Sequence, residues 1–209
     1  MATSLLLNLI AVIAFTLLPS STITSAAIPP PQIFFNACHS GDIATITDLL
    51  SEHPTLVHST SRDGDHCIHI VTIDGRVDII RVLLENGANP NIQSLPVNRM
   101  RMHPLGWAAI FGRYEAMELL INYGAHVNTD FDIEMGNGQM KELTALDVVE
   151  MMLDTNQDAD SSIKMREIVM NRIGKESEGK ERFAKTMEVL MKHGAKRVSE
   201  LNDGSNDEL

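Results

Sequence analysis

The sequence is poor in several residue types, and each shortage excludes a class of protein. It has two cysteines in 209 residues, too few for the disulfide framework of a small secreted domain. Its 17 basic residues face 28 acidic ones, and the formal net charge is -11. This balance argues against nucleic-acid binding through a general electrostatic footprint. The chain has one tryptophan, Trp107, so any site built on an indole must use it.

Motifs that mark common enzyme classes are missing as well. The chain contains no Gly-x-Ser-x-Gly, phosphate-binding loop, dinucleotide-binding fingerprint or His-Glu-x-x-His. The one nucleophile-like grouping is Cys67 beside His66 and His69. We therefore expect a protein that is not an enzyme, with no catalytic residue and no cofactor.

What the sequence does contain is a repeated pattern. Residues 63–91 carry an Asp-Gly turn, a short apolar segment, Gly75, an amphipathic segment and Gly87. A second copy follows 37 residues later, with Gly112 and Gly124 in place of Gly75 and Gly87. Self-similarity at a period near 33 residues is typical of solenoids built from stacked units.

Each copy predicts a short helix, a glycine turn and a longer helix. Apolar residues three and four positions apart share one face of a helix. The predicted buried stripes of the longer helices are Ile79, Val82, Leu83 and Leu84, and Ala116, Leu119, Leu120 and Ile121. Gly87 and Gly124 follow these stripes, where a residue in the left-handed conformation ends a helix.

The pattern resembles the ankyrin repeat family. That family's Thr-Pro-Leu-His appears here as His66-Cys67-Ile68-His69, His103-Pro104-Leu105-Gly106 and Thr144-Ala145-Leu146-Asp147. Its Gly-Ala-x-x-Asn ending appears as Gly87-Ala88-Asn89-Pro90-Asn91 and Gly124-Ala125-His126-Val127-Asn128. The resemblance covers about Phe34 to Val198. It implies an all-α ankyrin repeat solenoid, made of helix-turn-helix repeats with β-hairpin fingers, that binds another protein.

These patterns divide the chain into four parts. We expect a signal peptide at 1–27, a proline-rich lead-in at 28–33, an ankyrin repeat domain at 34–198 and an acidic tail at 199–209. The repeats are predicted at about 34–62, 63–95, 100–130 and 142–198, and the last repeat contains an inserted segment at 153–181.

The two ends of the sequence predict a location in the secretory pathway. Leu5 to Leu18 is almost wholly apolar but shorter than the roughly 20 residues of a membrane span. Small residues before Ile28 suit signal cleavage, after which no stable span is expected. An uncleaved anchor and an incidental apolar tail are the alternatives. Asn206 to Leu209 is similar to the Lys-Asp-Glu-Leu retrieval signal, which indicates the ER lumen, with a cytoplasmic or membrane-anchored location as the alternative.

Several local structures are also predicted. The prolines at 29–31 predict a non-helical lead-in, and the segment from Phe131 to Leu143 predicts a hairpin around Asn137-Gly138. Within the inserted segment we expect a helix at 162–173 with the apolar stripe Met165, Ile168, Val169 and Ile173. A charged loop at 174–181 and a closing helix at 182–192 should follow it, and the acidic tail should be disordered.

The two cysteines are expected to be free thiols. By repeat alignment Cys38 lies late in one short helix and Cys67 lies just before the next one. An offset of about five residues is on the order of 7 Å along a helix, in addition to the spacing between helices. A disulfide remains the alternative.

The candidate partner-binding site lies on the exposed side of the short helices and on the fingers. It comprises Ile70, Ile73, Trp107, Ile110, Phe111, Met151 and Met152, with Arg99 and Arg101 from a finger. Apolar patches usually mark interaction sites, and tryptophan is enriched in interface hot spots. The alternatives are that these residues pack between repeats, or that the segment after Leu153 covers them.

Two rival functions remain open. One is a metal-binding or redox protein that uses His66, Cys67, His69 and His103, since zinc sites need three or four ligands with a short-spaced pair. However, the resemblance places both His66 and His69 in the tetrapeptide, whose side chains bond to backbone groups, so no metal is predicted. The other rival is a membrane-tethered or cytosolic regulatory subunit.

Overall fold

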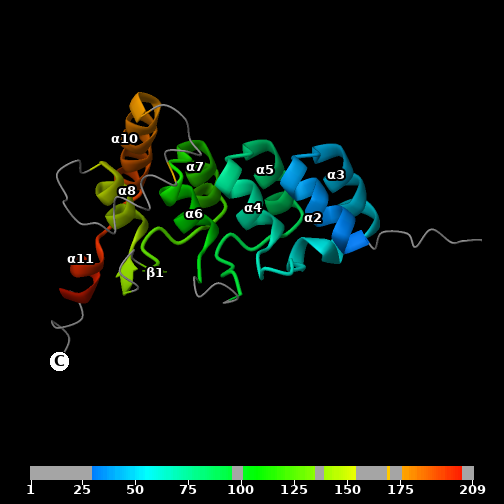
Figure 1. The fold of residues 1–209 in the computed structure, drawn as a ribbon, viewed down its shortest axis with the longest axis horizontal. Helices are drawn as coiled ribbons and strands as arrows, with labels where there is room; N and C mark the ends of the chain where they lie inside the picture. Colours follow the sequence, from blue (N-terminus) through cyan, green and yellow to red (C-terminus); the bar gives the residue numbers. More distant parts are fainter. Residues whose placement is uncertain (1–29, 96–100, 135–138, 154–168, 170–175, 204–209) are drawn as a thin grey trace, which may run out of the picture.

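The computed structural model describes residues 30–95, 101–134, 139–153, 169 and 176–203. These residues form helix pairs that stack side by side in an elongated solenoid (Figure 1). The pairs are α2 (Pro30–Ser40) with α3 (Ile43–Glu52), α4 (Cys67–Asp74) with α5 (Val77–Glu85), α6 (Pro104–Ile110) with α7 (Tyr114–Asn122), and α8 (Ala145–Leu153) with α10 (Glu176–Lys192). The other elements are the 3-10 helix η1 (Pro54–His58), strands β1 (Phe131–Glu134) and β2 (Met140–Leu143), and α11 (Val198–Asp203). The predicted all-α solenoid is confirmed.

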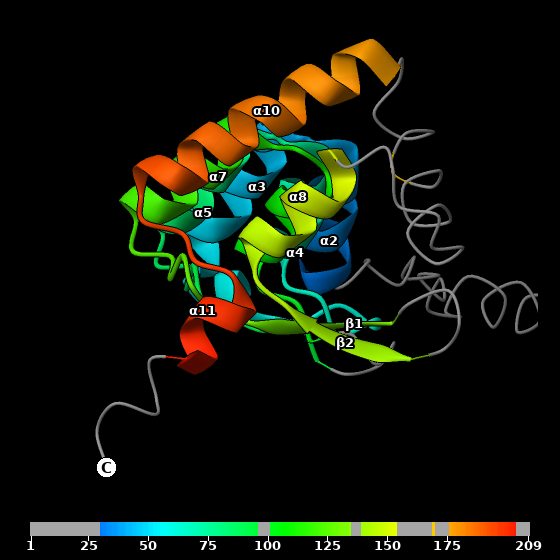
Figure 2. The same cartoon turned by 90° about the vertical axis from the view of Figure 1, so that its left-hand side faces the viewer.

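The helices form two layers. The first helices of the pairs, α2, α4, α6 and α8, contact one another in sequence and make one layer. The second helices, α3, α5, α7 and α10, make the other layer, while the β hairpin projects from one edge (Figure 2). Each pair thus buries its apolar faces against its neighbours.

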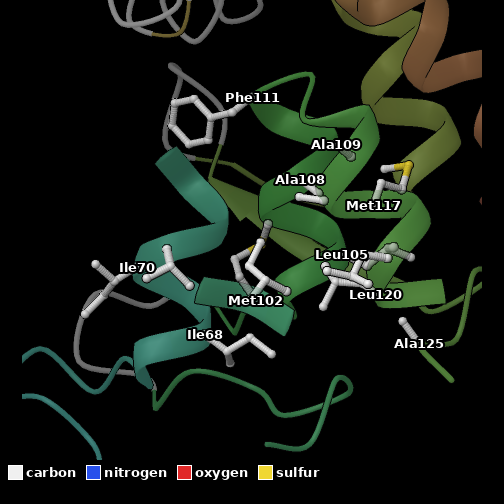
Figure 3. Close-up of a cluster of buried hydrophobic side chains, with 14 of the residues drawn as sticks. Ile68, Ile70, Met102, Leu105, Ala108, Ala109, Phe111, Met117, Leu120 and Ala125 are labelled. Atoms are coloured by element: carbon white, nitrogen blue, oxygen red, sulfur yellow. The ribbon is translucent and has the colours of Figure 1, made fainter. Parts of the chain in front are cut away.

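The core runs through the whole stack. Six residues of the predicted stripes are nearly or fully buried, namely Ile79, Leu83, Leu84, Ala116, Leu119 and Leu120. Val82 and Ile121 are only partly buried and pack at the margin of the core. Figure 3 shows the cluster where α4 meets α6 and α7, and it includes Met102, a fully buried finger residue. The sequence did not single out Met102, because it lies outside the helical periodicity.

The glycines after the second helices have the predicted conformation. Gly87 has φ 88° and Gly124 has φ 91°, which a residue with a Cβ adopts only at a cost. A Cβ on either residue would meet no atom within 4 Å. Backbone conformation, and not crowding, therefore favours glycine at these two positions.

The proline-rich lead-in differs from its prediction. Helix α2 begins at Pro30, so Pro30 and Pro31 lie in its first turn. The prediction is wrong for these two residues because the N–H groups of a first helical turn have no partner within the helix, and proline is tolerated there.

The hairpin prediction is confirmed for its two strands. Strands β1 and β2 pair antiparallel, from Phe131 opposite Leu143 to Glu134 opposite Met140. Phe131, Ile133 and Leu143 are buried, so one face of the hairpin packs against the stack. The expected Asn-Gly turn lies outside the described residues.

The last repeat is more helical than predicted. Helix α10 starts at Glu176, so the charged loop expected at 174–181 is wrong from residue 176 onward. Four of the six residues from 176 to 181 are Glu or Lys, which favour a helix once it can dock. The predicted closing helix at 182–192 is confirmed. Met191 lies on its exposed side, with 60% of its surface accessible. The helix expected at 162–173 lies outside the described residues except for Val169, which is helical and fully buried.

The acidic tail also begins with ordered structure. Helix α11 covers residues 198–203, so disorder is the wrong prediction for 199–203. Two carboxylates accept hydrogen bonds at its start: Val198 N donates to Asp147 Oδ2 at 3.0 Å, and Arg197 N donates to Glu200 Oε2 at 3.0 Å. Such N-terminal caps stabilise a short helix that composition alone does not predict.

The expectation of two free thiols is wrong. Cys38 in α2 and Cys67 in α4 form a disulfide, and their Cα atoms are 5.8 Å apart. The offset along the helix adds to the spacing between helices only where the two helices lie parallel and in the regular register of the repeats. Here the end of α2 and the start of α4 meet, within the distance that a disulfide needs. Both residues are buried in the core.

Candidate functional site

The structure separates the predicted partner-binding residues into two groups. Ile70, Ile110, Phe111 and Met152 are buried, so the expectation that they face solvent is wrong. The four short helices are enclosed by the neighbouring repeats and by their own second helices, which leaves few positions open. The residues that reach the surface are Ile73, Trp107 and Met151, which are partly exposed, and Arg101, which is exposed. Arg99 lies outside the described residues.

Trp107 and Phe111 form an aromatic pair on one side of α6. Their ring centroids are 6.1 Å apart and the rings are nearly parallel, with an interplanar angle of 26°. Phe111 lies at the end of α6 (Figure 3). The Trp107 Nε1 atom is buried and has no hydrogen-bond partner among the described residues. A buried donor without a partner costs about 1–3 kcal/mol, so packing is what holds this indole within the described part of the chain.

His69 has a structural role in the second repeat. Its Nδ1 atom accepts a hydrogen bond from the backbone N–H of His66 at 3.0 Å. Its Nε2 atom lies 3.0 Å from the carbonyl oxygen of Ile92. A carbonyl can only accept, so Nε2 carries the proton and Nδ1 is the acceptor. Both ring nitrogens are therefore occupied.

His103, just before α6 in the third repeat, contacts the same finger as His69. Its Nδ1 atom donates to the carbonyl oxygen of Asn91 at 2.9 Å. Its Nε2 atom accepts from the side-chain amide of Gln93 at 3.1 Å. The two histidines thus hold consecutive residues of one finger, from two successive repeats.

Burial keeps these imidazoles neutral. Desolvation lowers the pKa of His69 to about 4, although its hydrogen bond to Ile92 opposes the shift. Desolvation also lowers the pKa of His66 and of His103. Neutral imidazole is the form that both hydrogen-bond patterns require.

The same contacts weaken the metal-site alternative. Cys67 is bonded to Cys38 and cannot act as a thiolate ligand. His69 has no ring nitrogen left to bind a metal. Within the described ranges, no group of three or more histidine, cysteine, aspartate or glutamate side chains is arranged to hold a metal ion.

The asparagines of the repeated ending tie each repeat to the next. Asn91 donates to the Gly124 carbonyl at 2.9 Å and accepts from His126 N at 2.8 Å. Asn128 does the same one repeat later, donating to the Gly194 carbonyl at 3.2 Å and accepting from Lys196 N at 2.7 Å. The second pair of contacts spans the inserted segment, so the insertion leaves the register of the stack unchanged.

Two arginines that the sequence reasoning missed also link repeats. Arg76 donates to the His39 carbonyl at 3.1 Å and lies over Gly41. Arg113 donates to the Ile73 carbonyl at 3.0 Å and lies over Gly75. The sequence contains a pattern that could have identified them, because each arginine directly follows a turn glycine. The pairs are Gly75-Arg76 and Gly112-Arg113.

A cavity of about 490 Å³ lies beside these arginines. Its lining includes Arg113, Tyr114, Glu181 and Lys185. Lys185 pairs with Glu181 at 2.9 Å and lies over the ring of Tyr114, while Arg113 is engaged by the previous repeat. Because Lys185 and Glu181 pair with each other and Arg113 contacts the previous repeat, this cavity is better explained as a joint between repeats than as a ligand site.

Comparisons with known proteins agree with this architecture. Residues 34–130 match the model for ankyrin repeats, in three copies. The chain is similar to the serine/threonine-protein kinase VIK of Arabidopsis thaliana, with 35% identity over 41% of this chain and 19% of the relative. It is also similar to the E3 ubiquitin-protein ligase XB3 of Oryza sativa subsp. japonica, with 30% identity over 45% of this chain and 20% of the relative.

A third relative belongs to another class of protein. The human NAD-capped RNA hydrolase NUDT12 is 32% identical over 42% of this chain and 18% of the relative. The chain thus spans only about a fifth of the length of each of these relatives. The similarity to each relative is therefore confined to a segment of it. Residues 34–130 are therefore three ankyrin repeats, and the chain folds as an all-α ankyrin repeat solenoid.

Proposed function

We propose that this chain is a non-catalytic module that binds another protein over its first helices and fingers, with Trp107 at the centre of the contact. Ankyrin repeats generally mediate contacts between proteins, and the observation that carries the proposal is the state of Trp107. The indole is partly exposed and stacks on Phe111, and its N–H has no partner in the described part of the chain. A rigid, supported aromatic side chain supplies contact area at a small entropic cost.

The surface around Trp107 extends to both sides along the stack. Ile73 precedes it in α4 and Met151 follows it in α8, and both are partly exposed. Arg101 contributes a charge from the neighbouring finger. Ile70, Ile110, Phe111 and Met152 are buried, so they are not proposed as direct contacts.

Replacing Trp107 by alanine should weaken partner binding by a factor of about 30, which corresponds to a hot spot of about 2 kcal/mol. A photo-reactive residue at the exposed position of Arg101 identifies the partner by crosslinking. Calorimetry with the purified partner then gives the dissociation constants. The Tyr123→Ala variant is the matched control, because Tyr123 is an exposed aromatic residue in the other layer. Unchanged affinity of the Trp107→Ala variant, or equal losses in both variants, would rule out this surface.

We also propose that the chain acts in the lumen of the secretory pathway. The support comes from the Cys38–Cys67 disulfide, since disulfides form and persist in oxidising compartments. The apolar segment from Leu5 to Leu18 and the sequence from Asn206 to Leu209 are compatible with the same location. Both lie outside the described residues. Within the described ranges, every helix falls short of the length and apolar character that crossing a membrane requires.

A lumenal protein should start near Ala27 or Ile28 and should contain no free thiol. Both properties can be measured on protein from its native cell, by N-terminal sequencing and by alkylation before and after reduction. We expect alkylation of Cys38 and Cys67 only after reduction and denaturation. A start at Met1 or Ala2 together with two reactive thiols would contradict the location, and would favour the membrane-tethered or cytosolic alternative.

A further inference from the structure

We propose that His69 and His103 form an acid-sensitive clamp on the finger segment Asn91–Gln93, and that protonation of His69 opens the junction between the second and third repeats. The segment meets three parts of the stack. His69 holds it from α4, His103 holds it from the start of α6, and the Asn91 side chain holds it to Gly124 and His126. This inference concerns regulation and does not depend on the identity of a partner.

The geometry at His69 does not accommodate a second proton. Its Nε2–H already donates to the Ile92 carbonyl, so protonation must occur at Nδ1. That atom accepts the backbone N–H of His66. A protonated Nδ1 would place two donors against each other and break this bond, which holds the start of α4. The side chain is fully buried, so water cannot replace the lost acceptor.

The charged groups around His69 offer little compensation. The Asp65 carboxylate lies 3.8 Å from Nδ1 and is the nearest anion. Burial, followed by the charge of Asp63, raises the pKa of Asp65, so this carboxylate itself tends to be neutralised in acid. His66 and His103 also face His69, and each opposes its protonation. His58 has the same effect on His66.

His103 can accept a proton with less disruption of its hydrogen bonds than His69 can. Its Nε2 atom accepts from the Gln93 amide, and this amide can rotate to present its oxygen to a protonated ring. Asp130 favours the charged form of His103, while His126 opposes it. His69 therefore determines the response to acid, and His103 mainly positions the finger.

The sign of the effect follows from the direction of the shift. The pKa of His69 is lowered from 6.5 to about 4 in the folded chain. The free energy that neutral His69 contributes to the folded junction is therefore fully present above pH 6.5. It is lost as the pH falls toward 4. At pH 5 the linkage relation gives an equilibrium constant for opening about 30-fold larger than at pH 7.5. Because the released finger belongs to the proposed binding surface, acid would alter that surface.

Hydrogen exchange at pH 7.5 and pH 5.0, corrected for the intrinsic exchange rate, tests the clamp. We expect peptides covering 88–95 and 103–110 to lose protection at pH 5.0 by a factor of about 30, and peptides from α10 to lose much less. The His69→Gln variant should lack this pH dependence even if it is less stable at both pH values. The change in protection between the two pH values reports proton uptake on opening, and not the absolute stability. The His53→Gln variant, which changes an exposed histidine at the end of α3, should behave as the parent protein does.

A second measurement applies even if the His69→Gln variant does not fold. The imidazole resonances of His69 in the unaltered chain should stay in the neutral position from pH 8 to pH 5, as NMR can follow. Titration of His69 near pH 6.5 in the folded chain would overturn the proposal. An equal loss of protection throughout the stack at pH 5.0 would overturn it too.

Discussion

Replacing Phe183 by alanine is expected to lower the free energy of unfolding by about 3–5 kcal/mol, the range for a buried aromatic residue. Phe183 is fully buried in α10. It packs on the turn of the previous repeat, where a Cβ at Gly112 would lie 3.3 Å from the ring. Loss of the ring would leave a cavity between the third and fourth repeats that the rigid turn cannot fill.

The matched control for Phe183 lies on the same helix. Met191 is 60% exposed, and the Met191→Ala variant should change the free energy of unfolding by less than about 0.5 kcal/mol. Urea unfolding followed by circular dichroism gives the overall change, while the fluorescence of the single tryptophan reports on the third repeat. If the two variants lose similar stability, the placement of Phe183 in the core is wrong.

Removal of the Cys38–Cys67 disulfide has the second large expected effect. The two cysteines are 29 residues apart, and closing a loop of that length contributes about 3–4 kcal/mol by the chain-entropy relation. The Cys38→Ala/Cys67→Ala double variant should therefore unfold at a lower urea concentration than the parent protein. The first repeat, which the disulfide joins to the second, should lose its hydrogen-exchange protection before the others.

Chemical reduction offers an independent check of the same bond. Both cysteines are at most 1% exposed, so a thiol reagent can reach the disulfide only after α2 and α4 separate by local unfolding. We expect reduction to be slow in buffer and rapid in urea. Unfolding of the parent protein and the double variant at the same urea concentration would show that the disulfide is absent.

The sequence predicted the parts of the fold that depend on local order. The stripes of the second helices, the left-handed Gly87 and Gly124, and the paired strands of the hairpin each follow from residues that are near neighbours in the chain. A periodic pattern also predicts its own stacking, because each copy must bury the same face.

Features that depend on tertiary packing were predicted less well. The exposure of Phe111 and Met152 was inferred from helical position, but the space around a short helix is decided by neighbouring repeats. The disulfide depends on how the end of α2 approaches the start of α4, which repeat spacing does not specify. The start of α10 was missed because its first residues are polar, and polar residues join a helix when the rest of it is docked.

The insertion in the last repeat has a consequence for folding kinetics. Helices α6 and α7 are joined by residues 111–113, whereas α8 and α10 are joined across residues 154–175. Closing the longer connection costs about 2 kcal/mol more in chain entropy, and contacts between distant residues slow folding. The closing helix also leaves the ribosome after the other repeats. The last repeat is therefore the latest unit to join the stack during synthesis, and until then the third repeat is the temporary end of the growing solenoid.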